Sequence, residues 1–134
     1  MAKIDYEELL REASIDVVRR ILSKVAKDGF SGKQHLYITF ATKHPRVKIS
    51  KDLKEDDDLT IVLQYEFWDL KIDNSGFSVG LAFDKGDEEI YVPFSALINV
   101  SDPSADFDLN FVPDFKDCPK QPIQNVISLA DFKK

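Results

Sequence analysis

The N-terminal part of the chain carries apolar side chains at the spacing of a helix. The residues that recur at intervals of three or four are Leu10, Ala13, Val17, Ile21 and Val25. This spacing places them on one stripe of an α-helix. We therefore predict a helix over residues 4–27, and no other segment shows a clear helical pattern.

Capping residues mark both ends of this predicted helix. Asp5 stands at the N-cap position and Glu8 follows three residues later, as in a capping box. Gly29 follows the last turn, where a glycine commonly ends a helix.

The apolar stripe is wider than contact with one sheet needs, because Leu9, Val18 and Leu22 extend it. Two interpretations stay open. In the first, the helix only covers the core. In the second, part of its surface pairs with a second copy of the chain, through the residues Leu10, Ala13, Val17 and Ile21.

From His35 onward the apolar period changes to two. Four segments rich in β-branched and aromatic residues predict four or five strands: HLYITF, TIVLQYEF, FSVGLAF and EIYVPFSAL. Turn-forming residues separate them, at positions 43–45, 55–58, 73–76 and 84–87. Because these connections are short, we expect antiparallel neighbours. The fold class is then α+β, mainly β, with a small antiparallel barrel after the helix.

The strand FSVGLAF alternates large apolar residues with small ones. The small face consists of Ser78, Gly80 and Ala82. A face without bulky side chains lets another backbone approach, so an extended peptide can lie there. Candidates for the rim are Gln64, Phe67 and Trp68. The alternative is that the small residues pack under a loop or under the helix.

Length and charge narrow the class of protein. A chain of 134 residues with 43% hydrophobic residues is long enough for one domain with a real core. The net charge is −6, and residues 52–89 hold twelve acidic residues against three lysines. We therefore expect neither nucleic acid nor an anionic membrane as a partner.

Cysteine content and hydropathy predict a cytoplasmic setting. Cys118 is the only cysteine, so no internal disulfide can form, and it lies between Asp117 and Pro119 with no evident base to activate it. No apolar stretch resembles a signal sequence or a membrane span.

Candidate catalytic and metal-binding motifs are weak. His35 and His44 stand nine residues apart without the spacing of a zinc motif. Residues 55–58 lack the alternating carboxylates, the central glycine and the closing glutamate of an EF-hand loop. The chain also has no phosphate-binding glycine loop and no GxSxG elbow. We predict no enzyme, no metal site and no cofactor.

Several longer stretches carry a family resemblance. They are HLYITFATKHPRVKIS, TIVLQYEFWDL, FSVGLAF and VPFSALINVSDPS, flanked by IDYEELLREA near the start and ISLADFKK at the end. Together they resemble the alphaproteobacterial branch of the stringent starvation protein B family, whose members are adaptors for the ClpXP protease.

This resemblance implies a homodimer built on the N-terminal helix and a compact Sm-like or SH3-like β fold. It also implies a groove that binds polypeptides carrying ssrA degradation tags, and no enzymatic activity. The residues that it places at the tag are Gln64, Tyr65, Phe67, Trp68, Gly80 and Ala82.

The resemblance further divides the chain into three parts. Residues 1–112 form the folded dimerising and peptide-binding domain, residues 113–125 a short proline-containing linker, and residues 126–134 a flexible tail. The tail resembles the motif that docks on the N-terminal zinc-binding domain of ClpX. Its contact residues are Val126, Ile127, Ser128, Leu129 and Phe132.

Two other classes of function stay open. A small-barrel RNA-binding protein would stack bases on aromatic side chains such as Tyr37, Tyr65, Phe67 and Trp68, although the acidic strand region disfavours it. The other class is a structural dimer that binds no peptide.

Overall fold

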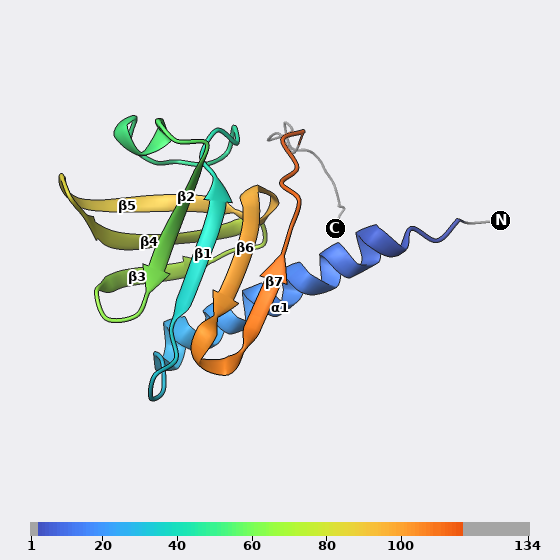
Figure 1. Ribbon diagram of the computed structural model, residues 1–134, viewed down its shortest axis with the longest axis horizontal. Coiled ribbons are helices and arrows are strands. Elements are labelled where there is room, and N and C mark those ends of the chain that lie inside the picture. The colour runs from blue at the N-terminus through green and yellow to red at the C-terminus, as the bar shows by residue number, and fades with distance from the viewer. Residues whose placement is uncertain (1–2, 117–134) are drawn as a thin grey trace.

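The computed structural model describes residues 3–116. In this part of the chain one helix precedes seven strands (Figure 1). Their bounds are α1 (Tyr6–Asp28), β1 (Leu36–Ala41), β2 (Asp58–Leu63), β3 (Phe67–Ile72), β4 (Gly76–Phe83), β5 (Gly86–Pro93), β6 (Leu97–Asp102) and β7 (Phe107–Asn110). Three short 3₁₀ turns complete the order: Asp52–Lys54, Phe94–Ala96 and Pro103–Ala105. The prediction of an α+β fold that is mainly β is confirmed.

Helix α1 is capped as predicted. An Asp5 side-chain oxygen accepts a hydrogen bond from the Glu8 amide at 3.1 Å. At the other end Gly29 has a φ of 74°, and its N–H donates to the Val25 carbonyl at 2.9 Å. Positive φ costs glycine little, so the helix ends there.

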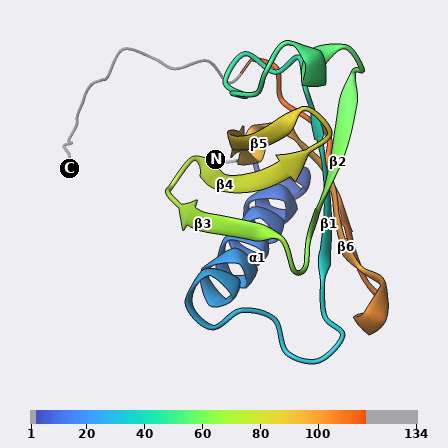
Figure 2. The ribbon, with the colours of Figure 1, turned by 90° about the vertical axis from the view of Figure 1, so that its left-hand side faces the viewer.

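The strands form two antiparallel sheets with the orders β2-β1-β6-β7 and β3-β4-β5. The strands of one sheet run across those of the other (Figure 1), and α1 packs against β3 (Figure 2). The core fills the space between these layers. Its largest fully buried apolar side chains are Phe40, Phe77, Leu22, Ile38, Leu63, Ile90 and Leu97.

Two predicted strands were wrong because each contains a break. TIVLQYEF is not one strand: β2 ends at Leu63, and the chain bends before β3 begins at Phe67 in the other sheet. In β3 a bulge between Trp68 and Lys71, with Asp69 at a φ of 52°, interrupts the alternation of apolar residues. EIYVPFSAL likewise divides, because β5 ends at Pro93 and a 3₁₀ turn follows.

His44 anchors the last described residues to the body of the domain. The ring is 1% exposed. Its Nδ1 accepts a hydrogen bond from the Arg46 amide at 3.0 Å, and its Nε2 lies 3.0 Å from both the Asp114 carbonyl and the Ser95 hydroxyl. Because Nδ1 accepts, Nε2 carries the proton and donates. The histidine therefore has a structural role.

Replacing His44 with alanine is expected to lower the free energy of unfolding by about 2 kcal/mol, because it leaves a cavity and removes the ring's hydrogen bonds to Arg46, Ser95 and Asp114. Urea unfolding followed by circular dichroism measures the change. The matched control is His35→Ala, since His35 is partly exposed and contacts only Tyr37 and the Lys33 carbonyl. Equal losses in the two variants would contradict the anchoring role.

Candidate functional site

A groove of about 410 Å³ lies where the two sheets meet at the turn between β2 and β3. It is lined by β2, by the turn and by the end of β4. The lining residues are Thr60, Ile61, Val62, Gln64, Tyr65, Glu66, Leu81, Ala82 and Phe83. Among them Glu66 alone is charged, so the lining is mainly apolar and neutral.

The first wall of the groove is the open edge of β2, the outermost strand of its sheet. Just beyond the ends of β1 and β2, the Thr42 amide donates to the Asp57 carbonyl at 3.0 Å, so these two residues form a hydrogen-bonded pair. Hydrogen-bonded and non-hydrogen-bonded pairs alternate along an antiparallel ladder. Three positions away Thr39 stands opposite Thr60, which is therefore a non-hydrogen-bonded pair. The N–H and C=O groups of Thr60 and Val62 therefore point away from β1, toward the groove.

The second wall is the end of β4. The Phe94 amide donates to the Ser75 carbonyl at 2.8 Å, which sets the alternation along β4 and β5. By this alternation Ala82 directs its backbone groups to the side of β3. However, β3 starts only at Phe67, which pairs with Leu81, so no strand within residues 3–116 lies beside Ala82. The groove thus has an unpaired backbone edge on each side.

Three of the six residues predicted to bind peptide line this groove, namely Gln64, Tyr65 and Ala82. Tyr65 is the most exposed of them, at 83%. Phe67 is half-buried and packs edge to face on Phe30, with ring centroids 6.2 Å apart.

The other two predicted residues, Trp68 and Gly80, form a cross-strand pair outside the groove lining. A Cβ added at Gly80 would lie 2.5 Å from the Trp68 ring carbon Cδ1 and closer still to Nε1. The indole therefore lies directly over the glycine. The small face of β4 is covered at this point by a tryptophan, neither by a loop nor by the helix.

Replacing Gly80 with alanine is expected to displace the indole. Trp68 is 39% exposed and has room to swing outward, so we expect a loss of about 1 to 2 kcal/mol of stability. Trp68 is the only tryptophan in the chain, and its emission should shift to longer wavelength. An unchanged emission spectrum would show that the ring does not rest on Gly80.

The sequence did not single out Thr60 and Val62. Both lie inside TIVLQYEF, and alternation indicates only that they face away from the core. Their contribution comes from outward backbone groups, which depend on β2 being an edge strand. Strand order in a sheet has no direct signal in a single sequence.

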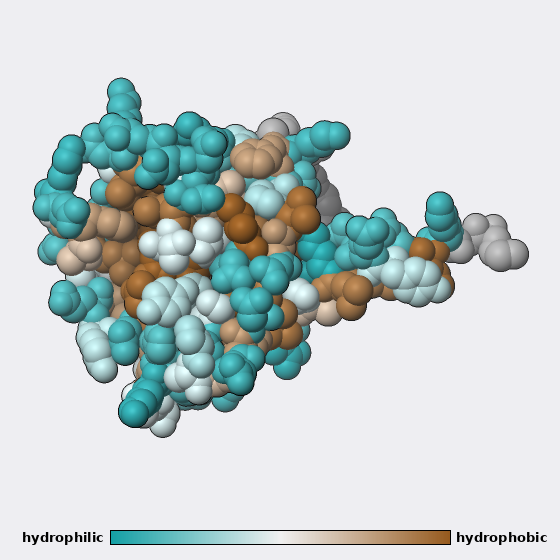
Figure 3. Space-filling model, in the orientation of Figure 1, coloured by the Kyte–Doolittle hydropathy of each residue, from teal (hydrophilic) through white to brown (hydrophobic). Residues whose placement is uncertain are grey.

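The predicted dimer residues divide between two environments. Leu10 is 69% exposed and Val17 41% exposed, and Ala13 is exposed too, whereas Ile21 is half-buried against the core. The adjacent stripe of α1 is buried through Val18, Leu22 and Val25. The helix therefore covers the core with one stripe and exposes hydrophobic residues along its projecting part (Figure 3).

Metal and membrane sites find no support in the described part of the chain. Residues 3–116 contain no group of three or more His, Cys, Asp or Glu side chains arranged to hold a metal ion. No helix within these residues is long and apolar enough to cross a membrane.

A family model for stringent starvation protein B matches residues 7–127. The match covers α1 except its first residue, all seven described strands and the whole groove lining. The chain belongs to the stringent starvation protein B family. Stringent starvation protein B proteins are protease adaptors, so this is a family of adaptors and not of enzymes. A search of curated proteins gave no match.

Some of the residues on which the family resemblance makes predictions lie outside the described part of the structure. Cys118, the linker from residue 117 onward and the predicted tail contacts lie beyond the described residues. The division into a folded domain, a linker and a tail therefore stays a prediction.

Proposed function

We propose that this protein binds ssrA-type degradation tags in the groove and tethers the tagged polypeptide to the ClpX unfoldase through residues 126–134. The observation that supports this most is the pair of unpaired backbone edges, at Thr60 and Val62 on one side and Ala82 on the other. An extended peptide satisfies such edges by adding a strand.

In this binding mode, main-chain hydrogen bonds supply most of the affinity and side-chain contacts supply the selectivity. Phe83, which is half-buried, offers apolar contact to a side chain of the peptide, while Gln64 and Tyr65 flank it from the turn. Attraction by overall charge plays no part, because the protein is acidic. Binding should therefore depend little on salt, unlike binding of RNA.

Tethering converts capture of the substrate by ClpX into an intramolecular event. A short flexible linker gives an effective concentration on the order of millimolar. Asp114 is held to the domain, so the linker that remains is residues 117–125. A flexible coil of that length would span about 16 Å. A weak contact at each end is then enough for delivery, and the adaptor needs no ATP of its own.

We further propose that the exposed stripe of α1 forms a homodimer, which doubles the number of tails per assembly. Replacing Leu10 with aspartate is expected to give a folded monomer, since Leu10 is 69% exposed and is not among the buried core residues. Sedimentation velocity measures the mass. The matched control is Glu12→Ala on another face of α1. A Leu10→Asp variant that sediments like the parent dimer would contradict this interface.

The proposal is tested by degradation of a tagged fluorescent protein by ClpXP at substrate concentrations below saturation. The full chain should accelerate degradation, and a chain without residues 126–134 should bind the tag yet inhibit delivery. A substrate without the tag controls for direct effects on the protease. Equal acceleration by the full and shortened chains would contradict tethering by the tail. No effect of the full chain on the tagged substrate would contradict the adaptor function.

A further inference from the structure

A second pocket, of about 440 Å³, lies at the opposite end of β4 from the groove. There the turn at residues 73–76 meets α1 and the loop that follows β1. The chain has four arginines, and three of them line this pocket: Arg11, Arg19 and Arg46. On a protein with a net charge of −6, this pocket therefore gathers most of the guanidinium groups.

Arg19 is held in a fixed orientation at this pocket. Its Nη1 lies 3.2 Å from an Asp16 carboxylate oxygen, and its Nη2 donates to the Asn74 carbonyl at 3.3 Å. The guanidinium carbon sits 5.2 Å from the centroid of the Phe94 ring. Its Nε is buried and has no hydrogen-bond partner among residues 3–116. Such a donor carries a desolvation penalty.

Other donors around the pocket are also unused. The Arg11 guanidinium and the Ser75 hydroxyl make no side-chain hydrogen bond or ion pair with any residue in the range 3–116. Two carboxylates, Glu12 and Asp114, share the lining with the three arginines. A third carboxylate, Asp16, pairs with Arg19, so an anion would be held by the unused donors of the pocket and not by an excess of positive charge.

We propose that this pocket binds an oxyanion, held by Arg11, Arg19 and Ser75. The shared chemistry is that of a compact group with several acceptor oxygens, which guanidinium groups bind through paired N–H donors. The bound oxyanion is either a free phosphate ion or a side-chain carboxylate of another polypeptide. Because the pocket and the groove lie at opposite ends of β4, this inference does not depend on peptide binding in the groove.

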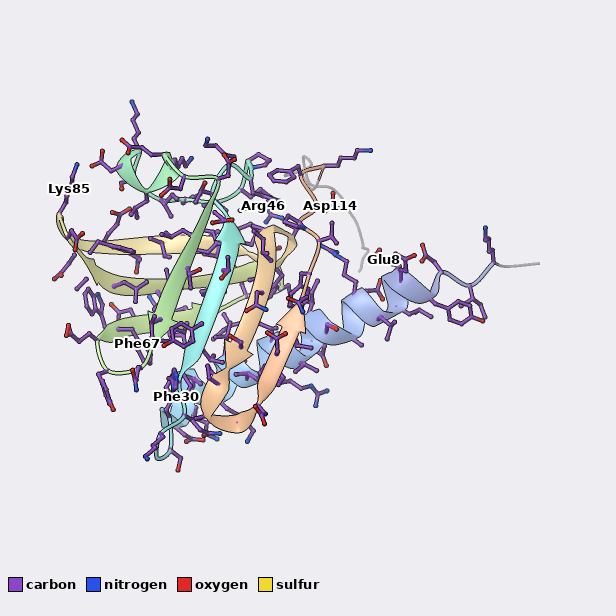
Figure 4. The ribbon with its side chains drawn as sticks, viewed as in Figure 1. Glu8, Phe30, Arg46, Phe67, Lys85 and Asp114 are labelled. Atoms are coloured by element: carbon purple, nitrogen blue, oxygen red, sulfur yellow. The ribbon has the colours of Figure 1, made fainter. Side chains whose placement is uncertain are left out.

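The position of the pocket gives the bound anion a structural consequence. Asp114 lies beside Arg46 in the lining (Figure 4) and is the residue that His44 anchors. The linker begins in this region of the sequence. A bound oxyanion would connect α1 with the turn at residues 73–76, next to the point where the chain leaves the domain.

The test is a titration of the full ¹⁵N-labelled chain at pH 7.5 and constant ionic strength, followed by amide chemical shifts. One arm adds sodium phosphate and the other adds N-acetylglutamate, with sodium chloride as the replaced salt. We expect saturable shifts at residues 11–19 and 74–76 in at least one arm. Arg11→Gln should weaken that binding about tenfold or more. Lys24→Gln, which removes the same charge from α1, should not, because Lys24 is exposed and lines a different pocket.

Saturable binding of phosphate, of N-acetylglutamate or of both would support the site and would show which kind of oxyanion it binds. Shifts that grow linearly and equally with all three salts would overturn the proposal. So would an Arg11→Gln variant that binds as tightly as the parent chain. Arg11 is preferred to Arg19 for this test because the Arg19 side chain also packs on Phe94, and its loss can disturb the fold.

Discussion

Replacing Gly76 with alanine is expected to lower the free energy of unfolding by at least about 3 kcal/mol. An added Cβ would lie 2.6 Å from the Pro93 Cα and closer still to the Val92 carbonyl oxygen. Both are backbone atoms of β5, paired with β4 along its whole length. Neither can move without opening the sheet. Urea unfolding followed by tryptophan emission and by circular dichroism measures the loss.

Gly80→Ala is the matched control for this prediction, since it makes the same change in the same strand. There the added methyl group meets a half-exposed side chain, Trp68, instead of backbone. The loss should therefore be clearly smaller. If Gly76→Ala were as stable as Gly80→Ala, the close packing of β4 on β5 at residues 92 and 93 would be wrong.

Replacing Val62 with proline is expected to weaken tag binding at least tenfold and to leave the fold intact. Proline removes the outward N–H of β2 and places its ring where an added strand would approach. The ladder with β1 does not use this N–H, because Val62 stands in a pair whose backbone groups point outward. Proline is tolerated on edge strands for this reason.

The control for this variant is Val62→Thr, which keeps the N–H and a β-branched side chain. It should bind the tag within about twofold of the parent chain, since only side-chain contact changes. Peptide affinity is compared by anisotropy, and the melting temperature confirms the fold. Equal affinities for the proline and threonine variants would exclude strand addition at β2, although the groove could still bind through side chains.

Much of the architecture could be predicted from local patterns. The helix, its Asp5 cap and its Gly29 end depend on neighbouring residues, and so do the turns at residues 73–76 and 84–87. The inward face of β4 also followed from alternation, because Phe77, Val79 and Leu81 are buried. Each of these features depends on residues that are close together in the sequence.

The candidate site could be predicted only in part, because it depends on relations between distant segments. Gln64, Tyr65 and Ala82 meet in one groove because β2 and β3 belong to different sheets. Only three residues separate these two strands, and the sequence pattern there does not show that the chain changes sheets. The indole of Trp68 over Gly80 depends on strand register after a bulge. The outward backbone of Val62 depends on which strand is outermost. Neither register nor strand order follows from alternation alone.

The central claim, that the groove binds degradation tags, is tested most directly by fluorescence anisotropy. A labelled ssrA-tag peptide is titrated with the full chain, beside a peptide of the same composition in scrambled order. Saturable binding of the tag alone, nearly unchanged between low and high salt, is the predicted result. Equal binding of both peptides, or no binding of either, would contradict tag recognition by this protein.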